Sequence, residues 1–139
     1  MAIYLNNKVG VKVNNVDLSD LVTNVTLNRS FDELEVTAMG DTGHRYVKGL
    51  EASSVTIDFL NDDASAKTLQ TLQSTWGTTV EVKLLQDKAT AVGATNPLYT
   101  FNVLVNNTTP INGTPADISM QSVTWNVQGA TSVATTGTF

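Results

Sequence analysis

Few side chains in this sequence could do acid–base chemistry, and its single histidine, His44, decides most of the question. A Ser-His-Asp triad could use only His44. The sequence contains no Gly-x-Ser-x-Gly elbow, no Gly-x-x-x-x-Gly-Lys-Ser/Thr phosphate loop and no His-Glu-x-x-His zinc helix. It also has no cysteine, which excludes disulfides and thiolate sites for zinc or iron–sulfur clusters. We therefore expect no enzyme, no metal and no cofactor, and predict that His44 is a solvent-exposed or interface residue.

The carboxylates are the other candidates for chemistry. Asp62 and Asp63 are adjacent, but a calcium loop needs oxygen ligands at alternating positions and a closing glutamate, and these do not follow here. Capping of a helix is the role we expect for them. Glu33, Glu35 and Asp58 share a polar strand face on which serine and threonine, rather than the aromatic residues of a sugar cleft, accompany them. This face is either simply solvated or has a specific role.

Composition indicates a β-rich protein that makes extensive protein contacts. At 139 residues the chain fits one domain with one core. Only 15% of its residues are charged, against about 25% in an ordinary soluble domain, and 41% are hydrophobic. A net charge of −5 argues against binding DNA or RNA through phosphate neutralisation. From Met1 to Lys8 we find no basic region followed by an apolar run, and no stretch approaches the ~20 apolar residues of a membrane span, so we expect neither a secretory signal nor a membrane partner.

Alternation of apolar and polar residues with a period of two predicts strands along most of the chain. The alternating stretches are residues 9–13, 21–27, 34–36, 55–59, 80–84, 99–105 and 118–127. In the last stretch the apolar positions change parity between Met120 and Val123, which suggests a bulge or a strand covered on both faces. Few prolines or inward-pointing charges protect these strands, so exposed edges would invite aggregation unless another subunit pairs with them.

One helix is expected at about residues 62–76. Asn61, Asp62 and Asp63 offer N-cap oxygens and negative charge at the positive end of the helix dipole, and Gly77 supplies a C-terminal stop. The apolar face of this helix consists of Leu69, Leu72 and Trp76.

These elements predict a mainly β fold, a β-sandwich or partly open barrel with one flanking α-helix. A single domain is expected to span residues 1–129. The remaining tail, residues 130–139, has no amphipathic pattern and is expected to be mobile unless a neighbour orders it.

The connection between two of the strands is unusually long. Strands 34–36 and 55–59 could pair as a hairpin, and the segment 38–49 that joins them contains three glycines. Ordinary hairpin loops have two to five residues, and longer ones are usually functional.

This hairpin carries a family resemblance. Residues 32–50, Asp-Glu-Leu-Glu-Val-Thr-Ala-Met-Gly-Asp-Thr-Gly-His-Arg-Tyr-Val-Lys-Gly-Leu, followed by the strand 54–59, resemble the tail tube (major tail) proteins of long-tailed bacteriophages. The shared pattern is an acidic strand ending in Thr, then Gly-Asp-Thr, a basic-aromatic pair, Gly-Leu and an alternating strand. The later order of helix and strands, ending in Ser-Val-Thr-Trp-Asn-Val-Gln-Gly, is similar to the same family across most of the chain.

The resemblance implies a virion protein of the viral tail that is assembled in the host cytoplasm. Its subunits would form hexameric rings that stack into a hollow tube for genome ejection, with the sheets of all subunits joined into one inner barrel. Its partners would be copies of itself, a tail tip or tape measure protein and a terminator protein. DNA would pass through the lumen without specific binding.

The resemblance also implies roles for residues of the hairpin. The long loop would contact the adjacent ring, with polar contacts from Asp41, Arg45 and Lys48, and the acidic strand face would line the lumen. Six copies at −5 would carry −30, a wall that repels DNA phosphates. The expected inter-ring residues are Met39, Asp41, His44, Arg45, Tyr46, Val47, Lys48 and Leu50. The expected lumen-facing residues are Glu33, Glu35, Ser54, Thr56 and Asp58.

Three alternatives fit the same sequence less fully. A β-sandwich binding module, such as a virion decoration or immunoglobulin-like adhesion domain, would be a stable monomer or trimer with a short, rigid loop at 38–49. A tube protein of a contractile tail or a secretion system would share the fold of the phage tube protein. An enzyme would require His44 to act chemically.

Overall fold

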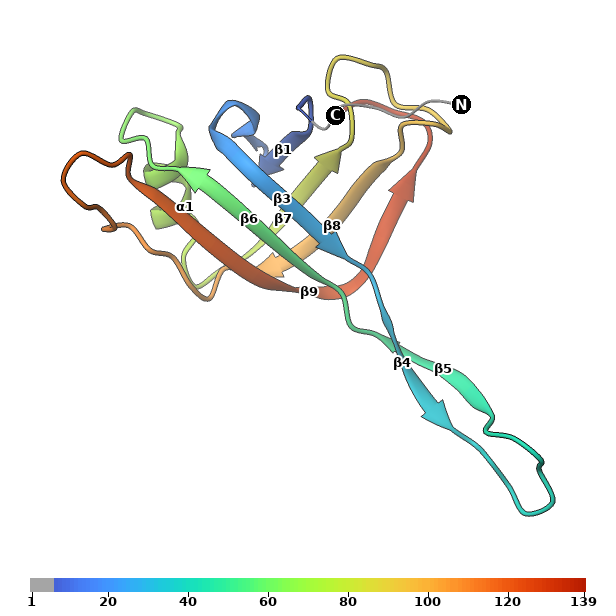
Figure 1. The fold of residues 1–139 in the computed structure, drawn as a ribbon. Helices are drawn as coiled ribbons and strands as arrows, with labels where there is room; N and C mark the ends of the chain where they lie inside the picture. The colour runs from blue at the N-terminus through green and yellow to red at the C-terminus, as the bar shows by residue number, and fades with distance from the viewer. Residues whose placement is uncertain (1–6) are drawn as a thin grey trace.

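A computed structural model describes residues 7–139, in which one curled antiparallel sheet of seven strands forms a half-barrel (Figure 1). The strand order across the sheet is β2-β1-β7-β8-β9-β6-β3. Its strands are β1 (Gly10–Val13), β2 (Val16–Asp17), β3 (Val22–Asn28), β6 (Ser54–Leu60), β7 (Thr79–Leu85), β8 (Leu98–Leu104) and β9 (Met120–Ala134). A second sheet contains β4 (Phe31–Glu35) and β5 (Tyr46–Glu51), and the helices are α1 (Thr68–Thr75) and the short 3-10 turn η1 (Ser19–Leu21). The predicted mainly β, partly open barrel with one flanking helix is confirmed.

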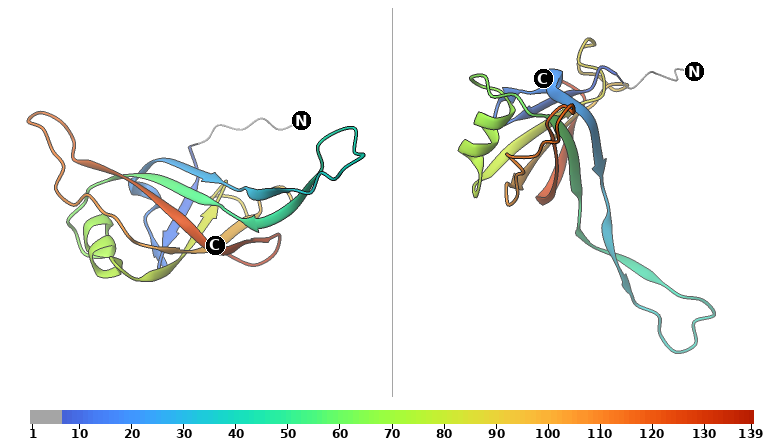
Figure 2. Two further views of the ribbon diagram at one scale, coloured as in Figure 1. Left: turned by 90° about the horizontal axis from the view of Figure 1, so that it is seen from below. Right: turned by 60° about the vertical axis from the view of Figure 1, so that its left-hand side comes forward.

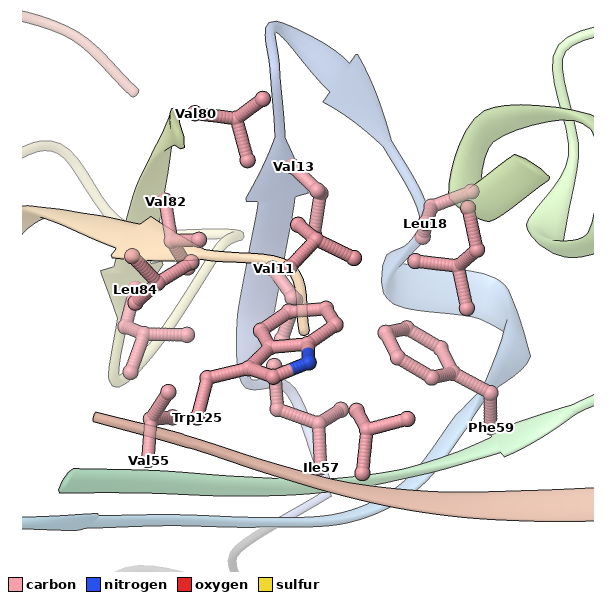
Figure 3. Close-up of a cluster of buried hydrophobic side chains, with 14 of the residues drawn as sticks. Val11, Val13, Leu18, Val55, Ile57, Phe59, Val80, Val82, Leu84 and Trp125 are labelled. Atoms are coloured by element: carbon pink, nitrogen blue, oxygen red, sulfur yellow. The ribbon is translucent and has the colours of Figure 1, made fainter. Parts of the chain in front are cut away.

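The core lies between the two halves of the curled sheet, where side chains from opposite strands meet (Figure 3). Strand β6 shows the expected alternation, because Val55, Ile57 and Phe59 are fully buried while the residues between them are only half-buried. Trp125 of β9 is fully buried at the centre of the same cluster. Burial of each such side chain stabilises the fold by roughly 1.5–3 kcal/mol.

Strand β9 joins the two halves. Its first part pairs with β6 from Ser54↔Asn126 to Leu60↔Met120, and its second part pairs with β8 from Val103↔Val127 to Leu98↔Ala134. Within the pairing with β8 the register shifts between Asn102↔Gln128 and Thr100↔Ser132, and in this stretch Gly129 adopts φ +74°, a conformation that glycine takes without strain. Residues 130–134 of the expected tail, which has no amphipathic pattern of its own, continue β9 through Ala134 and are ordered by pairing with β8.

The parity change near the start of β9 has a different cause from the one expected. The β6–β9 register is regular there, so no bulge is present. Gln121 occupies a core-facing position and is 2% exposed. Its Nε2 donates a hydrogen bond to Asn61 Oδ1 (2.8 Å), and its Oε1 accepts one from the Thr109 N–H (2.9 Å). Both ends of the amide are thus satisfied, as burial requires.

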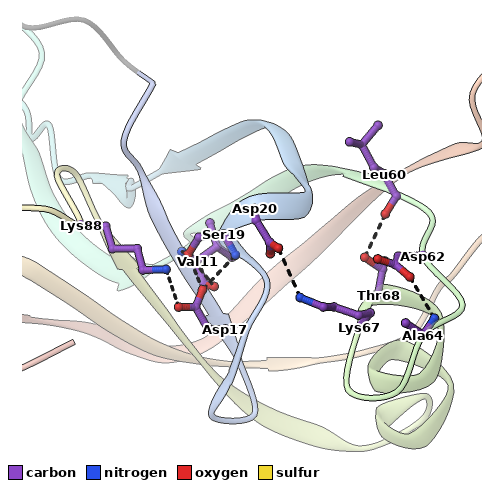
Figure 4. A network of polar contacts seen from close by, with 10 residues as sticks. All are labelled: Val11, Asp17, Ser19, Asp20, Leu60, Asp62, Ala64, Lys67, Thr68 and Lys88. Carbon is purple, nitrogen blue, oxygen red and sulfur yellow. Dashed lines mark hydrogen bonds and ion pairs between the residues drawn. The ribbon is translucent and has the colours of Figure 1, made fainter.

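The helix begins later than predicted. Asp62 Oδ1 accepts a hydrogen bond from the Ala64 N–H (2.9 Å), so it closes a local turn rather than capping α1 (Figure 4). The N-cap is Lys67, which makes no side-chain cap, and the Thr68 hydroxyl ties the first turn to the Leu60 carbonyl (2.9 Å). These turn hydrogen bonds compete with helix for the same backbone groups, which removes the first six residues of the expected range.

The end of the helix follows the prediction more closely. Gly77 takes φ +78° just beyond α1, the left-handed conformation that terminates helices. Of the three expected apolar residues, Leu72 is buried, Leu69 is half-buried and Trp76 is 58% exposed. Trp76 lies outside the helix as its C-cap, which turns its side chain away from the predicted face.

The predicted hairpin between strands 34–36 and 55–59 is wrong. Strand β6 pairs with β3 on one side and β9 on the other, so it belongs to the body of the sheet. Strand β4 pairs with β5 instead, from Phe31↔Glu51 to Glu35↔Tyr46. The ribbon β4–β5 is the continuation of β3 and β6 beyond the sheet, and it projects away from the body (Figures 1 and 2).

Within the described part of the chain no helix is long and apolar enough to cross a membrane. The expected lack of a secretory signal concerns the first eight residues, most of which lie outside 7–139.

Candidate functional site

The projecting ribbon, residues 31–51, is called the arm below. It consists of β4, β5 and the tip between them, and within residues 7–139 neither strand has a further strand beside it. Two strands without a covering layer have no core of their own. Most of the exposed large hydrophobic side chains among residues 7–139 are nevertheless found here, in contrast to the small scattered patches of a soluble monomer. They are Phe31, Leu34, Val36, Met39, Tyr46, Val47 and Leu50, with exposures from 41% for Val36 to 103% for Met39.

One face of the arm is aliphatic. Leu34 and Val47 are cross-strand partners and therefore point to the same side, and Val36, two residues beyond Leu34, shares that side. Gly49 permits the close pairing below them, because a Cβ there would lie 2.9 Å from the Asp32 carbonyl oxygen. The aliphatic face is thus a narrow apolar strip with nothing packed on it.

The opposite face of the arm carries charged and aromatic side chains together, because Tyr46 is the cross-strand partner of Glu35. Glu33 pairs across the strands with Lys48, whose ammonium lies 4.2 Å from the centroid of the Phe31 ring. His44 Nδ1 lies 3.0 Å from Glu35 Oε2, with both side chains more than half exposed. Exposed pairs of this kind contribute about 0–1 kcal/mol, so they orient side chains more than they stabilise the arm.

The tip has a defined conformation. Asp41 accepts a hydrogen bond from the Ala38 N–H (2.7 Å) and forms an ion pair with Arg45 (Nε–Oδ2 3.1 Å). The Arg45 N–H in turn donates to Thr37 Oγ1 (2.9 Å), and Gly40 takes φ +92° to close the turn. Two of the polar residues expected to contact another ring, Asp41 and Arg45, therefore already contact each other, so the tip has its shape before any partner binds.

The residues expected to line a lumen fall into two groups. Glu33 and Glu35 lie in the arm, whereas Ser54, Thr56 and Asp58 lie on the outer face of β6 in the body. The two groups are separate because β4, which carries Glu33 and Glu35, belongs to the two-stranded sheet, whereas β6 belongs to the seven-stranded sheet. Spacing in the sequence does not indicate this.

The outer face of β6 extends over both neighbouring strands. The Thr56 and Thr124 hydroxyls are hydrogen-bonded across β6 and β9 (3.1 Å). This polar ladder consists of Asn24, Thr26, Asn28, Ser54, Thr56, Asp58, Ser122, Thr124 and Asn126. It holds one carboxylate and no cation. Sequence reasoning missed the contributions of β3 and β9, although their Thr and Asn residues alternate with apolar ones in the same way.

The sheet ends in two unequal edges. The edge at β2 is two residues long, but the edge at β3 runs from Val22 to Asn28 without proline or charge. Such an edge presents unpaired backbone groups to any neighbouring strand.

His44, the sequence's one candidate for imidazole chemistry, lies in the arm, where its Nδ1 is within hydrogen-bond distance of Glu35 Oε2 at an exposed site. Within residues 7–139 no group of three or more His, Cys, Asp or Glu side chains lies close enough to hold a metal ion.

Comparison with known proteins identifies no family: no protein-family model matches the chain, and no curated protein is matched to it. Inference about function therefore depends on the arm, the polar ladder and the β3 edge.

Proposed function

We propose that this chain is a structural subunit that assembles with copies of itself into the stacked hexameric rings of a phage tail tube, a channel for genome delivery. The observation that carries the proposal is the arm with its seven uncovered large hydrophobic side chains. The resemblance of residues 32–50 and 54–59 to tail tube proteins supplies the class of assembly.

The arm supplies the apolar area that association needs. Covering the exposed part of each of its large side chains would contribute roughly 1 kcal/mol, since full burial contributes about 1.5–3 kcal/mol. Seven such contributions per subunit are enough to offset part of the entropy lost on association, and a ring repeats the contact at every subunit. Met39 at the tip and the aliphatic strip of Leu34 and Val47 are the main anchors.

The free edge of β3 supports the same assembly. Its backbone groups need a partner strand, and a second copy of the chain supplies strands of matching composition. Rotational closure of such contacts gives a ring in which every long edge is paired.

The polar ladder is suited to the channel wall. It carries Asp58 as its one carboxylate and no Lys or Arg, so it offers DNA phosphates no cation to bind. The net charge of −5 per subunit adds a weak repulsion that keeps the genome from sticking. We assign the wall to this face and leave Glu33 and Glu35 to the arm.

The proposal places the protein in the virion tail, after assembly in the host cytoplasm, with tail tip, tape measure and terminator proteins as further partners. The reading as a binding module requires a short, rigid loop at 38–49, and the long projecting arm speaks against it.

Electron microscopy of the purified full chain tests the proposal. Rings or tubes with a central channel, seen at high concentration or after addition of tail tip components, are the expected result. A monodisperse monomer under both conditions, checked by analytical ultracentrifugation, would contradict it.

A further inference from the structure

The root of the arm meets the body at one carboxylate. Glu51 is the last residue of β5, and its Oε2 accepts a hydrogen bond from the Thr131 N–H of β9 (2.8 Å) and one from the Ser53 hydroxyl (3.0 Å). Ser53 and Thr131 are buried, at 3% and 8% exposure, so both donors are fixed in the body. The Ser53 carbonyl is itself bonded to the Val127 N–H of β9 (2.9 Å).

Among residues 7–139, the hydrogen bonds of the rest of the arm, unlike those of Glu51, do not join it to the body. Ser30 and Ala52 exchange two hydrogen bonds, but these join the strands leading into and out of the arm and leave its direction open. The side-chain hydrogen bonds farther out, at Asp41, His44 and Arg45, stay within the arm. The two hydrogen bonds that Glu51 accepts, from Thr131 and Ser53, cross from the arm to the body.

The local chemistry favours a charged carboxylate at this position. The Thr131 N–H outweighs the opposing effect of burial and, with the Ser53 hydroxyl, holds the pKa of Glu51 below its ordinary value. Arg29 is the cation whose field acts in the same direction. The backbone N–H of Thr131 is the donor through which β9 contacts the arm at this carboxylate (2.8 Å).

This contact matters for assembly because the arm is long, so that a small rotation at its root moves its tip a long way. The arm extends roughly 35 Å from Glu51 to its tip at ~3.3 Å per strand residue, so a rotation of about 10° at the root displaces the tip by roughly 6 Å. A displacement of that size would take Met39 out of any pocket shaped for it, because packed interfaces tolerate far smaller errors.

We propose, resting on the proposed function, that Glu51 is the positioning residue of the arm: its carboxylate holds β5 to the Thr131 N–H of β9 and so fixes the direction in which the arm meets a second copy of the chain. Glu51 contacts no partner itself in this proposal. It acts by pre-organising the arm, which lowers the entropy lost on association.

The test measures arm direction in the dispersed subunit. Because the chain has no cysteine, spin labels can be placed at T42C on the tip and Q73C on the exposed face of α1. Pulsed electron paramagnetic resonance, with labelled protein diluted in unlabelled protein below the assembly concentration, gives the distribution of distances between them. In E51A the fraction of arms outside the main distance peak should rise about ten-fold, as expected for loss of a hydrogen bond to a charged acceptor.

Matched variants separate positioning from a general loss of structure. E51Q keeps an oxygen acceptor and should restore the main peak in part, whereas E51K places a cation against the two donors and should resemble E51A. E33A removes an arm carboxylate that does not touch the body and should leave the peak unchanged. Unfolding in urea should remain one cooperative transition in all four variants, with a midpoint lowered in E51A and E51K by no more than the lost hydrogen bonds explain. The concentration needed for assembly should rise only in E51A and E51K.

A distance distribution in E51A and E51K identical to that of the wild type would overturn the proposal. An equal broadening in E33A would also overturn it, because the effect would then not belong to the root contact. A wild-type chain that never assembles would instead count against the proposed function, and the distances in the dispersed subunit would still decide the role of Glu51.

Discussion

Strands β6 and β4 share one pattern of alternating apolar and polar residues, but the apolar side chains are buried in β6 and exposed in β4. In β6, Val55 and Ile57 alternate with polar residues and are fully buried against the other half of the barrel. In β4, Leu34 alternates with Glu33 and Glu35 in the same way, and all three are exposed. The difference is the presence of a second layer, since a strand can bury its apolar side only against something. Alternation therefore indicates which face of a strand is apolar, but it does not indicate whether that face is buried within the same chain or against another one.

The largest expected effect is on the body. W125A removes the largest fully buried side chain and should lower the free energy of unfolding by about 3–5 kcal/mol, measured by urea denaturation followed by circular dichroism. W76A is the matched control, because Trp76 is 58% exposed and its loss should change stability by no more than about 0.5 kcal/mol. Similar losses in the two variants would mean that the core is not where the fold places it.

Substitutions on the aliphatic face of the arm should weaken assembly while leaving the stability of the subunit unchanged. The double variant L34S/V47S should leave the free energy of unfolding within about 0.5 kcal/mol of the wild type. It should raise the concentration needed for assembly by roughly 10–100-fold, the effect of losing an anchor worth about 1.4–2.8 kcal/mol. Sedimentation over a concentration series measures this. E33Q, on the opposite face, is the control, and an equal effect there would remove the aliphatic face from the interface.

The close approach within the arm offers a smaller, local effect. G49A puts a Cβ 2.9 Å from the Asp32 carbonyl oxygen and should loosen β4–β5 pairing. Amide hydrogen exchange should show about ten-fold faster exchange in the arm and unchanged exchange in the body, as for a local opening facilitated by about 1.4 kcal/mol. G43A is the control, because a Cβ at Gly43 meets nothing within 4 Å. Unchanged protection in G49A would show that the ribbon is not paired as described.

The smallest expected effect is on the pH dependence of stability, which should change when a carboxylate of the body is removed but not when one of the arm is removed. Burial acts to raise the pKa of Asp17, but the Lys88 ammonium (Nζ–Oδ2 2.6 Å) and the Ser19 hydroxyl and N–H outweigh it and hold the pKa below its ordinary value (Figure 4). Because the folded-state pKa is the lower one, the stabilisation is present at neutral pH and is lost as pH falls through that folded-state pKa.

D17N should accordingly reduce the free energy of unfolding by at most about 1 kcal/mol at pH 7, and the difference from wild type should disappear as pH falls through the lowered folded-state pKa of Asp17. Urea denaturation across this pH range measures it. D41N in the arm serves as the comparison and should leave the unfolding transition of the body in place. A D17N deficit that persists undiminished at low pH would exclude the carboxylate as its source.

The sequence was most informative about where strands lie. Each alternating stretch coincides with a strand of the structure, because side-chain period is a local property. Gly77 likewise marked the end of the helix from its own backbone preference. The start of the helix was misplaced, because Asp62 can accept a hydrogen bond from a turn as readily as from a helix.

Which strands pair with each other could not be predicted from local sequence patterns. Whether β6 pairs with residues 34–36 or with β3 and β9 depends on contacts between segments far apart in the chain. For the same reason the order of residues 130–134 could not be seen, since it depends on the edge of β8. For the candidate site, spacing indicated that the hairpin region is unusual, but the role of Glu51 depends on Thr131, a residue 80 positions away.

We predict that the body folds alone and that the arm drives association. Ser30 and Ala52 are hydrogen-bonded neighbours at the root (N–O 2.8 Å), so residues 31–51 can be replaced by an Asn-Gly turn that joins β3 to β6 directly. Side-by-side electron microscopy and sedimentation of this armless variant and the wild type is the most direct test. We expect rings or tubes from the wild type, and from the armless variant a folded monomer with a cooperative unfolding transition. Assembly of the armless variant at the same concentration as the wild type would contradict this prediction.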